Sequence, residues 1–168
     1  MIVNSAVLGE VEVRSEDIIN FPGGMPGFEQ LKSFVLIKPE AELPFSYLQS
    51  VEEGDIAFLL TDPFIFYANY EFQLNEHVLE ELSIEDPADV LVWSIVTLKE
   101  DLQSATLNLL APVIINTRIN TGRQIILQHT SYTTKHALIV EAAEDTNLIQ
   151  TSAANEPLTD AASSGNGE

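Results

Sequence analysis

Adjacent acidic residues are the most frequent groups in this sequence that could do chemistry. Examples of such pairs are Glu52 with Glu53, Glu80 with Glu81, Glu85 with Asp86, and Glu100 with Asp101. Two carboxylates in a cleft at a defined separation, one of them with a raised pKa, form the catalytic pair of a glycosidase. Acidic pairs beside turns are more typical of a solvated face. A carbohydrate-active or metal-dependent hydrolase on a β scaffold therefore stands as the alternative function.

Three histidines, His77, His129 and His136, are the other candidate ligands or catalysts. They fall on a predicted helix, a strand end and another strand. Because the chain has no cysteine, a metal site would need histidines and carboxylates that converge on one face. The turn "TSYTTK" could bring His129 and His136 together, yet surface or hydrogen-bonded histidines explain them more simply. We predict no metal site.

Nucleophile and phosphate motifs are absent from the sequence. It has no Gly-x-Ser-x-Gly element, and "FPGGMPG" lacks the Lys-Ser/Thr pair that ends a phosphate-binding loop. The prolines and glycines of this stretch predict a turn instead. We expect no catalytic residue, no enzymatic activity and no cofactor.

The charge of the chain is strongly negative. Seven Lys and Arg stand against 26 Asp and Glu, for a net charge of -19. Six of the acids follow Lys135, so 20 acids and all seven bases remain in residues 1–135, with a net charge of -13. A bare nucleic acid or an anionic membrane would be repelled. The charge favours a basic protein partner, or it serves solubility alone.

Targeting and membrane signals are also missing. The first basic residue is Arg14, and no apolar signal core precedes it. The longest uncharged run, residues 102–117, is too short and too polar for a spanning helix. We expect a cytoplasmic protein that does not enter a membrane.

The composition changes near the end of the sequence. From residue 146 the aromatics vanish and Ala, Asn, Thr, Ser, Gly and Asp dominate. Such a segment cannot bury enough apolar surface to offset the entropy lost on ordering. We predict one folded domain over residues 1–143 and a disordered, acidic, Ser/Ala/Asn-rich tail over residues 144–168.

Short runs with a period of two dominate the predicted domain. A hairpin or bulged strand is expected around Gly9, and further strands are expected at "FVLIK", "FSYLQS", "IAFLLTD", "VLVWSIVTL", "ATLNLL", "PVIIN", "RQIILQ" and "ALIVEA". Helix is scarce. Asn75 is a good N-cap for "LNEHVLEELSI", and a second turn is expected at Ser15. The pattern predicts a mainly β fold: a compact antiparallel barrel-like or sandwich domain with one or two short helices.

The stretch "LNLLAPVIIN" is apolar but contains a proline, which a sheet ladder tolerates only at an edge, strand start or bulge. We expect two strands, residues 106–110 and 113–116, joined by a bend at Pro112. Asn108 and Asn116 flank the run, and amides are costly if buried unpaired. They are candidate contact residues, with an architectural role as the alternative.

Several of these pieces, in order, resemble the FliW-type flagellar assembly factors. The resemblance covers residues 2–140 and is carried by "GEVEV", "IINFPGGMPGFEQLKSFVLI", "PFSYLQSVE", "AFLLTDPFIFYANYEF", "VLVWSIVTL", "ATLNLLAPVIIN" and "RQIILQHTSYTTKHAL". It implies a non-enzymatic regulator with a barrel-like β domain that binds newly made flagellin. When flagellin is exported, such proteins bind the CsrA-type translational regulator instead. Binding relieves, non-competitively, the repression of flagellin messenger RNA.

Five further residues are candidates for contact with a protein partner. Leu48, Gln49 and Ser50 are chosen because a Gln-Ser pair at a strand end could bond to an added strand. In "DPFIFYANYEF", alternation places Phe64 and Phe66 on one face, and Tyr67 and Tyr70 suit a wet interface.

Overall fold

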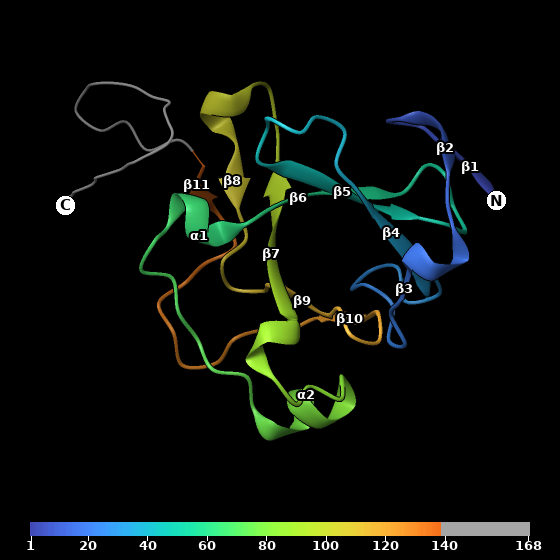
Figure 1. The fold of residues 1–168 in the computed structure, drawn as a ribbon. Coiled ribbons are helices and arrows are strands. Elements are labelled where there is room, and N and C mark those ends of the chain that lie inside the picture. The colour runs from blue at the N-terminus through green and yellow to red at the C-terminus, as the bar shows by residue number, and fades with distance from the viewer. Residues whose placement is uncertain (139–168) are drawn as a thin grey trace. The chain divides into compact units, whose positions relative to one another are not determined.

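The computed structural model describes residues 1–138, which form a mainly β domain (Figure 1). The predicted tail, residues 144–168, and the last five residues of the predicted domain lie outside the described residues. The prediction of a mainly β fold with short helices is confirmed. Within residues 1–138, no helix is long and apolar enough to cross a membrane.

Seven strands close into a barrel. Each strand pairs antiparallel with the next, except for a parallel contact between the first and the last strand of the sheet, β3 and β10. The strands in spatial order are β3 (Ile18–Asn20), β4 (Ser33–Ile37), β5 (Phe45–Ser50), β6 (Ala57–Thr61), β7 (Val90–Thr97), β9 (Val113–Asn116) and β10 (Thr121–Gln124). Pairing of β7 with β9 completes the circle, so the barrel, and not the sandwich, is the correct alternative.

The barrel interior is filled by one face of each strand. In β4, Phe34 and Leu36 point inward, while Val35 and Ile37 point outward, as the strand period of two requires. Phe34 meets Phe21 edge to face, with ring centroids 5.1 Å apart, and both rings are fully buried. Large aromatic side chains therefore plug the barrel and leave no pore.

A hairpin covers the outer face of β4. It consists of β1 (Ile2–Ser5) and β2 (Gly9–Glu12), which turn at Gly9 with a positive φ of 77°. Val3 and Val13 are buried with Val35 in a small outer core. The predicted hairpin is confirmed.

A second core lies outside β7 and β9. It is covered by α2 (Glu76–Glu81) and by the chain between residues 125 and 138, which includes β11 (His136–Ala137) paired with β8 (Thr106–Leu107). The Oδ1 atom of Asn75 accepts from the Val78 amide at 2.9 Å and starts α2, as predicted. The expected turn at Ser15 is the 3₁₀ helix η1 (Ser15–Asp17). Two more 3₁₀ helices are η2 (Pro87–Asp89) and η3 (Leu102–Ser104).

The alternation predicted for "DPFIFYANYEF" is wrong at the start of this segment, because residues Pro63–Phe66 form the helix α1. Asp62 accepts from the Phe64 amide at 2.9 Å, and Pro63 occupies the first helical position. An acidic N-cap followed by proline is a helix-start signal, which outweighs the alternation of the aromatic residues.

The bend at Pro112 is confirmed, although the strand before it ends at Leu107 instead of residue 110. β8 and β9 both pair with β7, one after the other. Residues 108–112 bulge out between them, opposite Ser94 and Ile95. The proline thus sits in a large bulge, where no ladder bond from its nitrogen is needed.

We predict that Gly122→Ala destabilises the barrel. An added Cβ would lie 2.7 Å from Cζ of the fully buried Phe21 ring. Overpacking of this kind costs about 1–3 kcal/mol of unfolding free energy, measurable by urea denaturation. Gly23→Ala is the matched control, since no atom lies within 4 Å of its added Cβ. Equal stability of the two variants would contradict the packing account.

Candidate partner-binding surface

The Leu48, Gln49 and Ser50 triplet is buried inside the fold. Leu48 fills the barrel, and β5 is already paired with β4 and β6 on its two edges. The Nε2 atom of Gln49 donates to the carbonyls of Ser50 (3.0 Å), Gly54 (3.2 Å) and Ile56 (3.2 Å). The Ser50 hydroxyl accepts from the amides of residues 52 and 53. These side chains hold the turn after β5, and the expectation that they meet an added strand is wrong.

Tyr67 and Tyr70 belong to an aromatic cluster with Tyr132 and His136. Tyr70 is buried and donates to the Leu109 carbonyl at 2.8 Å, while Tyr67 is half-buried and donates to the Ala137 carbonyl. The rings of Tyr70 and Tyr132 meet edge to face with centroids 4.8 Å apart. Burial, followed by the proximity of Tyr132, raises the pKa of Tyr70. Tyr70 is therefore a core residue and not a wet contact, whereas Tyr67 keeps part of its surface in solvent.

Asn108 closes the bulge between β8 and β9. Its Oδ1 accepts from the Ala111 amide at 2.9 Å, and its backbone amide donates to the Ile95 carbonyl at 3.0 Å. The Ser94 hydroxyl donates to the Asn108 carbonyl at 3.2 Å. These bonds give Asn108 the architectural role that stood as its alternative.

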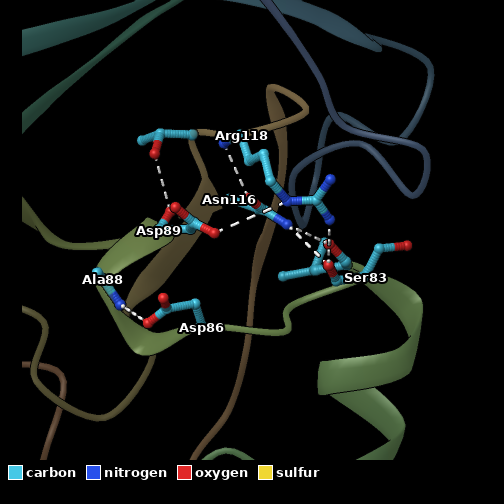
Figure 2. A network of polar contacts seen from close by, with 8 residues as sticks. Ser83, Asp86, Ala88, Asp89, Asn116 and Arg118 are labelled. Atoms are coloured by element: carbon cyan, nitrogen blue, oxygen red, sulfur yellow. Dashed lines mark hydrogen bonds and ion pairs between the residues drawn. The ribbon is translucent and has the colours of Figure 1, made fainter.

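Asn116 is fully buried at the end of β9 and ties the barrel to α2 (Figure 2). Its Nδ2 donates to the carbonyls of Leu82 (2.8 Å) and Ser83 (3.1 Å), and its Oδ1 accepts from the Arg118 amide (2.9 Å). Carbonyls at a helix C-terminus have no partner within the helix. The Arg118 guanidinium adds a bond to the Ser83 carbonyl (3.2 Å) and faces Asp89 (3.7 Å). Asn116 thus has an architectural role.

Half of the eight carboxylates in the predicted acidic pairs make a hydrogen bond or an ion pair within residues 1–138. Asp86 and Asp101 cap the 3₁₀ helices η2 and η3. Glu52 accepts from the amides of residues 32 and 33, and Glu81 forms an ion pair with Arg123. Two grooves on the described surface each contain a single carboxylate in their lining. No catalytic carboxylate pair lines either groove, so the hydrolase alternative gains no support.

The histidines do not converge. His136 accepts from the Thr133 amide at 2.9 Å, and burial lowers its pKa. His77 and His129 line a groove of about 420 Å³ between the chain before α2 and the chain after β10. Among residues 1–138, no group of three or more His, Asp or Glu side chains is arranged to hold a metal ion.

A second groove, of about 280 Å³, lies between α1 and β7. It is lined by Asp62, Phe64 and residues 90–93, which include the single tryptophan of the chain, Trp93. Phe64 is 42% exposed and Leu91 is 41% exposed. The neighbouring Ile65, which is 59% exposed, extends the apolar surface along α1. Exposed apolar residues gathered around a hollow mark an interaction surface. We call this the α1–β7 groove and take it as the candidate partner-binding surface.

None of the groove residues was a predicted contact. The alternating pattern around each of these residues is already explained by a packed strand. The groove exists only because β6 ends and α1 begins beside β7. The Asp62-Pro63 dipeptide was the available signal, since a proline there must stop a ladder.

The FliW protein family matches this chain over residues 2–138, which is all but the first of the residues that the structure describes. The chain belongs to the FliW family. The flagellar assembly factor FliW of Alkaliphilus metalliredigens is 42% identical over 142 residues, covering 84% of this chain and 88% of that protein. The FliW proteins of Moorella thermoacetica and Bacillus subtilis are each 41% identical, covering 93% and 82% of this chain and 99% and 96% of their own length.

A solved FliW structure confirms the barrel. The crystal structure of a flagellar assembly factor FliW superimposes with a TM-score of 0.78 at 38% identity. It covers 84% of this chain and 99% of that chain. The FliW resemblance inferred from the sequence is therefore correct in both family and fold.

We predict that Asn116→Ala loosens α2. The change removes a buried donor and leaves two carbonyls at the end of α2 without it, which costs about 2–3 kcal/mol of unfolding free energy. Urea denaturation followed by circular dichroism measures the loss. Asn69→Ala is the matched control, because Asn69 is exposed, and it should stay within about 0.5 kcal/mol of the parent. A parent-like Asn116→Ala variant would refute the architectural role.

Proposed function

We propose that this protein is a cytoplasmic flagellar assembly factor that acts by binding proteins and has no enzymatic activity. Membership of the FliW family over the whole described domain carries the proposal. Its two partners are newly made flagellin and a CsrA-type RNA-binding regulator. Binding to flagellin keeps the factor from CsrA, and export of flagellin frees it to bind CsrA and relieve the repression of flagellin translation.

The charge of the domain supports this mechanism in physical terms. Residues 1–138 contain 20 acids and seven bases. An RNA-binding regulator holds RNA largely through basic side chains on phosphates. An acidic domain that docks beside the RNA site lowers the local potential, so it opposes RNA without covering the site. The effect fits a non-competitive antagonist that does not itself bind nucleic acid.

Partner exchange is the direct test of the proposed function. Purified protein should form a complex with CsrA and a complex with flagellin, and excess flagellin should displace CsrA in size-exclusion chromatography. The expected result is two binary complexes and no ternary one, because the partners exclude one another. Absence of both binary complexes would overturn the proposal, and a stable ternary complex would overturn the partner switch.

The electrostatic mechanism has its own test. Glu10, Glu12, Glu40 and Glu42 are exposed, and their side chains make no hydrogen bond or ion pair within residues 1–138. Changing all four to Gln should weaken displacement of RNA from CsrA and flatten its dependence on salt, because less charge opposes the phosphates. The readout is RNA release measured by fluorescence anisotropy at several salt concentrations.

The same four positions changed to Asp provide the matched control, since they keep the charge and lose only a methylene each. Displacement by this control should equal that of the parent. If the Gln variant also releases RNA like the parent, with the same salt dependence, then electrostatic exclusion is wrong.

A further inference from the structure

The α1–β7 groove runs along the edge of a strand and not across the face of the sheet. Successive side chains of a strand point to opposite faces. Four consecutive residues of β7, 90–93, line the groove together. A hollow can contact both faces of one strand only if it follows the edge of that strand. The backbone of β7 therefore belongs to the groove wall.

The hydrogen bonds around β7 show which backbone groups face this edge. Thr117 donates to the Asp89 carbonyl (2.8 Å), and Asn108 donates to the Ile95 carbonyl (3.0 Å). Hydrogen-bonding groups alternate between the two sides of an antiparallel strand. Because the odd-numbered carbonyls face β9 and the bulge, the amides and carbonyls of the even-numbered Val92 and Ser94 face β6. The Val90 amide is already used, since it donates to the Pro87 carbonyl.

The ladder between β6 and β7 stops before it reaches Val92. Its last pair is Thr61 with Ser94. The next hydrogen-bonded pair in this register would be Pro63 with Val92, but Pro63 has no amide hydrogen and is the first residue of α1. No group within residues 1–138 bonds to the Val92 amide or carbonyl on this side. Within the part of the chain that the structure describes, β7 thus keeps a short stretch of free edge at Val92.

The surroundings of the edge select its occupant. The groove lining is apolar apart from Asp62, and it contains no Lys or Arg. The Asp62 carboxylate accepts from the Phe64 amide and has no cationic partner within residues 1–138. Near the start of β7, Asp86 caps η2 and has no cationic partner within residues 1–138, whereas Asp89 is paired with Arg118. We propose that the free edge of β7 binds an extended segment of a partner protein, with alternating apolar residues and a flanking Lys or Arg, as an added strand.

A second copy of the chain is the competing occupant, since two β7 edges could pair with one another. The net charge of -13 on residues 1–138 opposes that pairing, because like charges repel copies of the same surface. The same charge attracts a basic segment and increases its rate of encounter. Charge therefore favours a basic partner over self-association.

This inference rests on the proposed function, because it assigns the groove to a protein partner. Its test uses neither flagellin nor CsrA, so the two can fail separately. If both partner complexes form but the edge binds no strand, only the present inference is wrong. If the edge binds a strand but neither complex forms, only the proposed partners are wrong.

The test uses a synthetic peptide, acetyl-Lys-Val-Thr-Val-Thr-Val-Lys-amide, added to the full chain. Trp93 is the only tryptophan and lines the groove, so its fluorescence reports occupancy. We expect a saturable change in Trp93 emission and slower hydrogen exchange of the Val92 amide in nuclear magnetic resonance spectra. A peptide with Glu in place of Lys should bind more weakly, and added salt should reduce the difference.

Three variants localise the contact. Val92→Pro removes the free donor without breaking a bond to β9, and it should weaken peptide binding by about tenfold, the value of one hydrogen bond. Asp62→Asn keeps an N-cap for α1 and removes the charge, so it should weaken binding of the Lys peptide and leave the Glu peptide no weaker. Ile119→Ser is the matched control, because Ile119 is exposed and lies outside the candidate partner-binding surface, and binding should be unchanged.

Three results would overturn the inference. One is that neither Trp93 emission nor Val92 exchange responds to millimolar peptide. Another is that the parent and Asp62→Asn each bind the Lys peptide and the Glu peptide equally well. This comparison can be made even if Val92→Pro does not fold. The third is a dimer in analytical ultracentrifugation that Asp62→Asn strengthens, since the edge would then belong to a second copy.

Discussion

The pairing of β7 with β9 is the interaction on which most of this structure depends. Without it, the strands from β3 to β7 would form an open sheet with the aromatic interior exposed. The same pairing brings Asn116 to the end of α2, so closure of the barrel and attachment of the helix occur together. It also forces the chain to bulge at residues 108–112 before it pairs with the first half of β7.

The amide side chains that the sequence offered as candidate contacts instead stabilise the fold. Gln49, Asn108 and Asn116 satisfy backbone groups at a turn, a bulge and a helix end. Asp62, Asp86 and Asp101 cap short helices in the same way. The exposed apolar groups of the candidate surface lie instead beside α1, on a domain whose net charge is negative. Buried polar side chains and exposed apolar side chains thus have different roles. The buried amide network makes the domain rigid, and the exposed surface is available for contact with a partner.

Sequence reasoning succeeded where the cause of a structure is local. The Asn75 cap, the hairpin at Gly9 and the break at Pro112 each follow from the conformational limits of one or two residues. It failed at Gln49, because only the pairing of β5 on both edges buries that side chain. The helix α1 was missed because the prediction followed the alternation of the aromatic residues and did not use the helix-start signal of Asp62 and Pro63. The α1–β7 groove could not be predicted from local sequence. The free edge arises because β6 ends before the strand beside it, β7, and the pairing of the two strands is not visible in the sequence.

The parallel contact between Thr121 and Asn20 joins the two ends of the sheet across most of the described chain. Contacts this distant in sequence form slowly, since a long loop must close before they contribute any stability. On the ribosome, β3 to β7 emerge well before β9 and β10, with the aromatic face of an unfinished barrel uncovered. The barrel therefore cannot close before β10 has been synthesised, and nascent chains that lack β9 and β10 should be the form of this protein most exposed to aggregation.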